Sequence, residues 1–385
     1  MERVDALKLF KDCFQENATD LFTAAGRINV IGEHVDYCGG KVFPAALNLR
    51  CNVYARKNGL NVIRIALRGI DGIITLEIDK LNDYRDLKLG NYQAGVAYFL
   101  QQEGVEIVGC DLLYDCTVPF GSGLSSSAAI EVATAVTVCE YAGVAYDKVH
   151  LALVAQKAEN QYAGVNCGIM DQFASAMGKK DHAVLLDCST LAYEYVPLQL
   201  GDYAIVVANC NKPHNLVESK YNVRRQEVET ALKLIRTAKP VNNLAELSPE
   251  DFHEVKHLLS GVVCKRAEHV VMECARVKAA VSALKAGDIA ELGLLLNESH
   301  YSLRDLYEVT GKELDTLSAL ARKEKDCLGS RMIGAGFGGC TISIVKKSAV
   351  EGFIRRVGGA YYEAIGYKAS FYETSIEDGI TVTKL

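Results

Sequence analysis

The most informative stretch of the chain reads Gly26-Arg-Ile-Asn-Val-Ile-Gly-Glu-His-Val-Asp-Tyr-Cys-Gly-Gly40. Alternation over residues 27–31 predicts a short strand, which Gly32 ends. The polar side chains of this stretch that suit a binding site are Arg27, Glu33, His34 and Asp36. A carboxylate can accept hydrogen bonds from two neighbouring hydroxyls, so this set suits a small polyhydroxylated ligand. The alternative is a solvated, charged hairpin loop.

A second glycine-rich stretch reads Pro119-Phe-Gly-Ser-Gly-Leu-Ser-Ser-Ser-Ala-Ala129. Residues 128–138 are apolar nearly all round, which predicts a buried helix. A buried helix that begins at a Gly/Ser loop presents free N–H groups and the positive end of its dipole, an arrangement suited to a triphosphate. The alternative is a glycine-rich hairpin that caps a core helix. The Lys-Ser/Thr ending of a Walker loop and the protein-kinase signatures are absent, so the sequence excludes both folds.

A third glycine run, Gly334-Ala-Gly-Phe-Gly-Gly339, resembles a dinucleotide-binding fingerprint only in part. That fingerprint requires a helix to open within the glycines. Here the alternating residues 340–345 follow, which predicts a strand. We therefore expect a β-turn-β unit whose glycines lie against the cleft or a neighbouring loop.

Composition excludes several classes of protein. The 385 residues carry a net charge of −6 and a pI near 5.8, which argues against nucleic acid or an anionic membrane as the main partner. No run approaches the ~18 apolar residues of a membrane span, and the N-terminus lacks a signal-peptide core. The thirteen cysteines are scattered without a Cys-x-x-Cys, as expected of reduced thiols in a cytoplasmic protein.

The order of elements predicts an α+β fold. The chain should open with an amphipathic helix, because Val4, Leu7, Phe10 and Phe14 fall at helical spacing. Strands and hairpins are expected to about residue 115, then a mixed helical region to about 180. Strand-like segments follow at residues 184–186 and 205–207, then a helix-rich stretch over 221–325 and a final α/β piece.

Two carboxylates could perform chemistry beside these loops. Glu159 lies late in a helix predicted over residues 146–162, and Asp171 closely follows Gly168. Phosphoryl transfer needs a metal or cation on the phosphates and a carboxylate that accepts the proton of the acceptor hydroxyl. Taken alone, Glu159 fits a solvated helix position better than a catalytic one, and Asp171 fits a helix cap equally well.

Four further histidines are expected to be neither metal ligands nor catalysts. His253-Glu-Val-Lys-His257 matches the zinc-protease spacing, but no third ligand accompanies it. His214 and His300 are expected to be structural.

Together these segments resemble the galactokinases of the GHMP small-molecule kinase family, and the resemblance spans essentially the whole chain. Residues 26–44 resemble the galactokinase signature, 119–129 the shared phosphate loop and 334–339 the shared C-terminal glycine motif. Residues 167–172, 221–225 and 299–303 match further galactokinase patterns. The resemblance implies a two-lobed α+β GHMP kinase fold with its active site between the lobes, which we place at residues 1–198 and 199–385.

The resemblance also implies ATP-dependent phosphorylation of a sugar at its anomeric hydroxyl. Asp171 takes the place of the catalytic carboxylate, and Arg27 that of the arginine facing the transferring phosphoryl group. The implied Mg²⁺ ligands are Ser127 and Glu159. The implied sugar contacts are Glu33, His34, Asp36, Gly168 and Tyr221. The implied ATP-phosphate cradle consists of Gly121, Ser122, Gly123, Leu124, Ser125 and Ser126.

Two positions depart from the family pattern. Ala25 stands where proline is usual, and Cys38 where asparagine is common. A cysteine at position 38 is also similar to the N-acetylgalactosamine kinases, so that sugar, arabinose or another sugar remains an alternative to galactose. A non-catalytic galactose sensor is a more distant alternative, but the Ser125–Ala129 segment that sensors alter is intact. The sequence does not indicate the oligomeric state, and a monomer is compatible with it.

Overall fold

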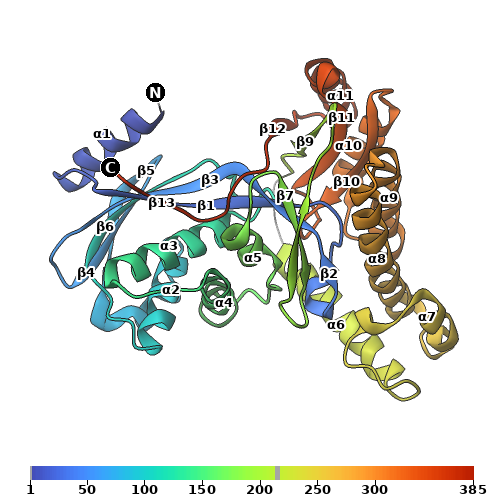
Figure 1. Ribbon diagram of the computed structural model, residues 1–385, viewed down its shortest axis with the longest axis horizontal. Helices are drawn as coiled ribbons and strands as arrows, with labels where there is room; N and C mark the ends of the chain where they lie inside the picture. The colour runs from blue at the N-terminus through green and yellow to red at the C-terminus, as the bar shows by residue number, and fades with distance from the viewer. Residues whose placement is uncertain (1, 213–216) are drawn as a thin grey trace.

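The computed structural model describes residues 2–212 and 217–385, so the expectation about His214 lies outside the described residues. Three sheets and their covering helices make up an α+β protein, as predicted (Figure 1). The first half of the chain builds a six-stranded sheet in the order β13-β1-β3-β6-β4-β5. Its strands are β1 (Asp20–Asn29), β3 (Pro44–Lys57), β4 (Val62–Leu67), β5 (Ile70–Glu77), β6 (Cys110–Cys116) and β13 (Thr381–Lys384).

Helices lie on both faces of this six-stranded sheet (Figure 1). One face carries α2 (Asn91–Gln102), α3 (Ser126–Ala142), α4 (Lys148–Ala158) and α5 (Met170–Met177). The buried helix predicted after the second glycine-rich stretch is α3, and its residues 128–130, 132, 133, 135, 136 and 138 are all buried. On the other face, α1 (Glu2–Phe14) buries Phe10 and Phe14 against Tyr54 and Leu113.

The second half of the chain builds a four-stranded sheet in the order β10-β11-β9-β12. Its strands are β9 (Tyr203–Asn209), β10 (Cys327–Ile333), β11 (Cys340–Lys346) and β12 (Ser370–Thr374). The helices of this half are α6 (Val217–Ile235), α7 (Pro249–Val255), α8 (Gly261–Lys285), α9 (Ile289–Ser302), α10 (Gly311–Lys323) and α11 (Val350–Ile365). A small sheet of β2 (Lys41–Val42), β7 (His182–Asp187) and β8 (Tyr193–Pro197) lies between the two halves (Figure 1).

The structure differs from the local expectations at three places. Helix α2 interrupts the region predicted to hold only strands and hairpins, because Ala94, Ala97 and Leu100 pack one helical face into the core. Val4 of α1 is 70% exposed rather than buried. The helix predicted over 146–162 is α4 followed by a single π turn, Glu159–Ala163, so the end of the predicted helix departs from α-helical geometry.

The chain ends beside its beginning. Strand β13 pairs antiparallel with β1, from Asp20 opposite Lys384 to Thr23 opposite Thr381. The last strand therefore belongs to the same sheet as the first, although helices and strands of the second half precede it (Figure 1).

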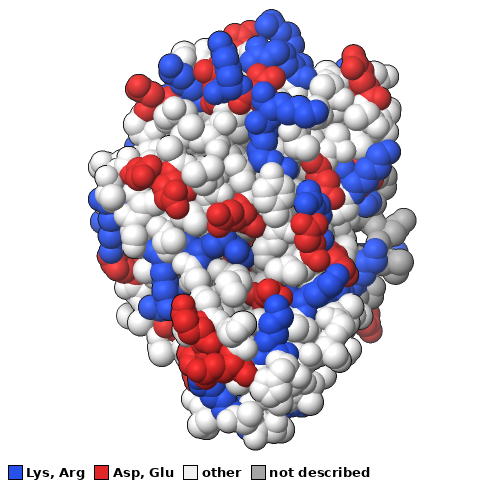
Figure 2. All heavy atoms as spheres, turned by 90° about the vertical axis from the view of Figure 1, so that its right-hand side faces the viewer, with Lys and Arg blue, Asp and Glu red and all other residues white. Residues whose placement is uncertain are grey.

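The surface fits the charge balance of the sequence. Basic and acidic side chains are interspersed on the face that Figure 2 shows, without one extended basic surface. In the described part of the chain, no helix combines the length and apolar character needed to cross a membrane.

Candidate active site

Most of the predicted site residues meet in one cleft of about 860 Å³ that opens to solvent. They come from the end of β1 and the loop after it, from the segment around α5, and from α6. Those that line the cleft are Arg27, Glu33, His34, Asp36, Glu159, Gly168, Asp171 and Tyr221. Gly334 and Ala335 of the third glycine run also line it, as do five residues that were not named as site residues, namely Gly164, Val165, Cys167, Met170 and Asn222.

An ion pair between Arg27 and Asp171 lies at the centre of this cleft. Arg27 Nε and Nη2 lie 2.9 and 2.7 Å from Asp171 Oδ1, and Nη2 lies 2.8 Å from Oδ2. Burial alone would lower the pKa of Arg27, but the carboxylates of Asp171 and Glu33 raise it, so the guanidinium stays charged. A charge-assisted, forked pair of this kind fixes the orientation of both groups.

The same two residues connect to the predicted phosphate loop. Arg27 Nη1 donates to Gly123 O at 2.6 Å, and the Ser125 hydroxyl donates to Asp171 Oδ2 at 2.6 Å. Helix α3 begins one residue later, at Ser126, so its free N–H groups lie beside the ion pair. The first two glycine-rich stretches, residues 26–40 and 119–129, are therefore connected through Arg27 and Asp171.

The third glycine run forms the predicted turn between β10 and β11 and packs against the phosphate loop. A Cβ atom at Gly334 would lie 3.0 Å from Gly123 O, and one at Gly339 would lie 2.8 Å from Ser122 O. Both glycines have positive φ, 80° and 86°. Because a side chain at either position would collide with backbone, these glycines are required for the two loops to meet.

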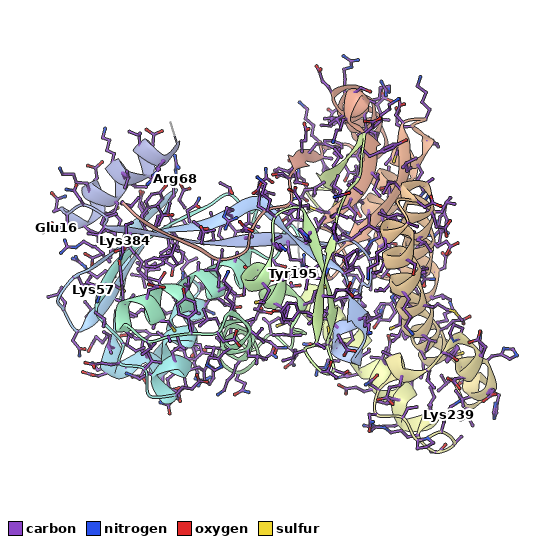
Figure 3. The ribbon with its side chains drawn as sticks, in the orientation of Figure 1. Glu16, Lys57, Arg68, Tyr195, Lys239 and Lys384 are labelled. Atoms are coloured by element: carbon purple, nitrogen blue, oxygen red, sulfur yellow. The ribbon has the colours of Figure 1, made fainter. Side chains whose placement is uncertain are left out.

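A second cavity, of about 970 Å³, adjoins the start of the phosphate loop and shares no lining residue with the first. Phe120, at the start of the loop, lines it and is 70% exposed. Arg68, labelled in Figure 3, follows β4 and pairs with Asp115 at 2.8 Å at its edge. The apolar and aromatic lining of this cavity comes from Leu67, Ile70, Leu89, Tyr92, Tyr114 and Ile130. Sequence analysis missed this cavity, because its walls come from five separate segments without a motif.

Glu33 and His34 line the cleft but are already held by protein groups. Glu33 Oε1 accepts from Arg331 Nη2 at 3.0 Å and from Gly334 N at 2.9 Å. His34 Nδ1 accepts from the Tyr37 hydroxyl at 2.9 Å, and Nε2 donates to Ala335 O at 3.2 Å. Burial lowers the pKa of His34 to about 3, which keeps the ring neutral and supports these roles of its two nitrogens.

The fully buried Arg331 was missed by sequence analysis. It donates to Asn29 O at 2.6 Å and to Val30 O at 3.0 Å as well as to Glu33. It therefore ties β10 of the second half to the end of β1.

Asp36 and Gly168 are in direct contact. A Cβ atom at Gly168 would lie 1.9 Å from Asp36 Oδ2, so only glycine leaves room for this carboxyl group. Burial, and then the charge of Asp171, raises the pKa of Asp36 to about 7. The Tyr221 ring lies 5.6 Å from His34 and closes this side of the cleft.

Cys38, which departs from the family pattern, is buried at the end of the short 3₁₀ turn Asp36–Cys38. Its thiol is directed toward His34 O at 3.9 Å, and it is not among the described residues that line the cleft. The position therefore affects the cleft through packing rather than through direct contact with a ligand.

Ser127 and Glu159 lie together beside the phosphate loop. The Ser127 hydroxyl is close enough to the Glu159 carboxyl group to lower its pKa, but burial and the charge of Asp171 together raise that pKa to about 7. A hydroxyl and a carboxylate at a triphosphate site are the hard oxygen ligands that Mg²⁺ prefers, and phosphates and water commonly complete its shell. The described residues therefore fit a Mg²⁺ ion that arrives with the nucleotide.

The zinc-protease spacing at His253 and His257 has no structural counterpart. Both side chains are exposed, and they lie in α7 and the 3₁₀ turn after it. Across residues 2–212 and 217–385, no group of three or more His, Cys, Asp or Glu side chains is arranged to hold a metal ion. His300 is buried as a structural residue, with Nδ1 accepting from Met332 N at 3.2 Å.

The fold and the cleft define a small-molecule kinase of the GHMP class. The GHMP kinases N terminal domain matches residues 91–179 and the GHMP kinases C terminal domain matches residues 280–364. A mevalonate kinase of Methanococcus jannaschii has the same fold, with a TM-score of 0.70 at 14% identity over 94% of this chain and 100% of that one. The two-lobed GHMP kinase fold is thereby confirmed.

A narrower comparison separates this chain from other members of the class. The galactokinase galactose-binding signature matches residues 8–57. A galactokinase of Clostridium tetani is 46% identical over 97% of this chain and 95% of its own. The crystal structure of Lactococcus lactis galactokinase complexed with galactose superimposes with a TM-score of 0.95, at 41% identity over 99% of this chain and 100% of that one. The chain belongs to the galactokinase family.

Proposed function

We propose that this enzyme transfers the γ-phosphoryl group of ATP to the anomeric hydroxyl of D-galactose, giving α-D-galactose 1-phosphate and ADP. The observation that carries the proposal is the Arg27–Asp171 pair, which joins the galactose-binding signature to the phosphate loop inside one cleft. The galactose complex of the Lactococcus lactis relative, at 41% identity, supports galactose as the acceptor.

ATP is proposed to lie across the phosphate loop. The backbone N–H groups of residues 121–126 and the N-terminus of α3 would bind its phosphates. The largely apolar cavity lined by Phe120 is the proposed site of the adenine ring, because it adjoins the loop and none of residues 26–40 lines it. Ser127 and Glu159 would hold Mg²⁺ on the phosphates, where the ion neutralises charge that develops during transfer.

Galactose is proposed to occupy the cleft between Asp36 and Asp171. Asp36 would accept from sugar hydroxyls, Gly168 provides the room, and Tyr221 covers the sugar. Glu33 and His34 would complete the contacts from positions that Arg331 and Tyr37 already hold. Asp171 would accept the proton of the anomeric hydroxyl, while Arg27 stabilises charge on the γ-phosphoryl group.

The direct test is ADP release with Mg-ATP across galactose, N-acetylgalactosamine, arabinose, glucose and mevalonate. We expect a clear preference for galactose. Preference for N-acetylgalactosamine would mean that the turn around Cys38 admits the larger substituent. Binding of galactose and ATP without ADP release would instead support a sensor, although the intact Ser125–Ala129 segment argues against that outcome.

Substitution Gly168→Ala is expected to raise KM for galactose at least tenfold while leaving KM for ATP within about twofold. The added methyl would overlap Asp36 Oδ2 at 1.9 Å and displace the proposed sugar contact. Steady-state kinetics with each substrate varied in turn measure the effect. The matched control is Gly359→Ala in α11, where a Cβ meets nothing within 4 Å. Unchanged galactose KM in Gly168→Ala would remove Asp36 and Gly168 from the sugar site.

Galactose affinity is expected to fall as pH falls below about 7. The pKa of Asp36 is raised to about 7, so below this pH the carboxyl group is protonated in the free protein and loses an acceptor for sugar hydroxyls. Each further unit of pH should weaken binding about tenfold. Calorimetric titration with galactose between about pH 5.5 and 8.5 measures this slope.

Asp36→Asn is the control for this pH dependence, because it should bind galactose weakly with no slope in the same range. Glu159 also has a pKa of about 7, and it is unchanged in that variant. A slope that persists in Asp36→Asn would therefore assign the titration to Glu159 or to another group and contradict the role of Asp36.

A further inference from the structure

Three buried polar side chains form a hydrogen-bonded chain that starts at the proposed metal ligand Glu159 and continues through Gln172 to Glu131. Gln172 Nε2 lies 2.5 Å from Glu159 Oε2 and 3.1 Å from Glu131 Oε2. Glu131 in α3 and Gln172 in α5 are both fully buried, and Glu159 is 6% exposed. One amide nitrogen thus donates its two hydrogens to two different carboxyl groups.

The position of Gln172 follows directly from that of Asp171. The two are consecutive in the first turn of α5, and consecutive helical side chains diverge by about 100°. Asp171 is directed to Arg27 and the cleft, and Gln172 is directed to Glu131 of α3. A single helical turn therefore orients the proposed proton acceptor and contacts the proposed metal ligand.

The contacts of Glu159 show what Gln172 contributes. Gln172 Nε2 and the Cys167 thiol, at 3.4 Å, both contact Oε2 of this carboxyl group. Oε1 of Glu159 takes neither of these contacts, and it is the oxygen proposed to bind the cation together with Ser127.

We propose that Gln172 is a positioning residue that holds the Glu159 carboxylate for the metal, and that Glu131 fixes the Gln172 amide from behind. The proposal rests on the proposed role of Glu159 as a metal ligand. Partners that orient a metal ligand in this way typically contribute tenfold to a hundredfold to metal affinity. Neither Gln172 nor Glu131 lines the cleft among its described residues, so neither is expected to touch the substrates.

The test is the affinity of the full-length enzyme for Mn²⁺ in the presence of a non-hydrolysable ATP analogue, followed by electron paramagnetic resonance. Gln172→Met removes both donors at similar volume and should weaken Mn²⁺ binding at least tenfold, with the galactose dissociation constant changed less than threefold. Ser175→Ala is the matched control, because its hydroxyl is buried on the same helix without a partner in the described structure. It should bind Mn²⁺ normally.

Two further variants keep the test decisive if Gln172→Met folds poorly. Glu131→Gln retains an oxygen that accepts from Gln172 and should bind Mn²⁺ nearly as wild type does, whereas Glu131→Met should bind it more weakly. Normal Mn²⁺ affinity in Gln172→Met, or in Glu131→Met where Gln172→Met does not fold, would overturn the proposal. Glu159→Gln tests the metal-ligand role of Glu159 separately from its positioning by Gln172. If this variant also binds Mn²⁺ normally, Glu159 is not a metal ligand.

Discussion

Asp171→Asn is expected to lower kcat by about 10²–10⁴-fold, the usual contribution of a general base, while galactose and ATP bind nearly as in the wild type. Asparagine has the same shape: its oxygen, at the position of Asp171 Oδ1, can still accept from Arg27, and its amide nitrogen, at the position of Oδ2, can donate to the Ser125 hydroxyl. It cannot take a proton from the anomeric hydroxyl. Single-turnover measurement of ADP formation, with galactose affinity from calorimetry, separates the loss of chemistry from a loss of binding.

The matched control is Asp187→Asn at the end of β7, whose carboxylate accepts from Ser189 and Thr190 outside the cleft. It should leave kcat unchanged. If Asp171→Asn kept more than a tenth of normal kcat, Asp171 would not be the proton acceptor. The ion pair with Arg27 would then serve only to organise the cleft.

Arg27→Ala is expected to lower kcat by about 10²–10³-fold, the scale seen when a charge-stabilising donor is lost from a reacting centre. The structure adds a second effect, because Arg27 Nη1 also holds Gly123 O of the phosphate loop at 2.6 Å. KM for ATP should therefore rise as well. Steady-state kinetics with ATP varied at saturating galactose measure both changes.

Arg27→Lys distinguishes the two roles of this side chain. Lysine keeps the positive charge but cannot reproduce the forked contact with Asp171 together with the contact to Gly123. It should recover part of kcat while KM for ATP stays raised. Equal kinetics for Arg27→Lys and Arg27→Ala would mean that geometry, and not charge, is what Arg27 supplies.

Local sequence was sufficient for features that short-range chemistry dictates. Apolar residues all round 128–138 predicted the buried helix α3, and the glycines at 334–339 followed by alternating residues predicted the β10–β11 turn. Val4 and α2 mark the limit of this reasoning. Helical spacing did not reveal that Val4 is exposed, and strands on either side of α2 obscured its periodicity.

Function was predictable to the extent that it resides in contiguous motifs. The predicted site residues Arg27, Asp36, Gly168, Asp171 and Tyr221 do line one cleft. Arg331, the apolar cavity lined by Phe120 and the buried Gln172–Glu131 contact were not found. Each depends on pairing between segments far apart in the chain, and a lone arginine or glutamine gives no sign of its partner.

The sequence by itself determined the class of the protein and the chemistry of its site. Residues 26–40, 119–129 and 334–339 specify turns, a helix N-terminus and a set of hydrogen-bonding groups through local geometry alone. The tertiary structure decided which side chains are free to act. It joined Arg27 to Asp171, tied Glu33 to Arg331 and raised the pKa of Asp36 to about 7. Burial and through-space charge produce these effects, and both depend on the packed neighbours of a residue rather than on its neighbours in sequence.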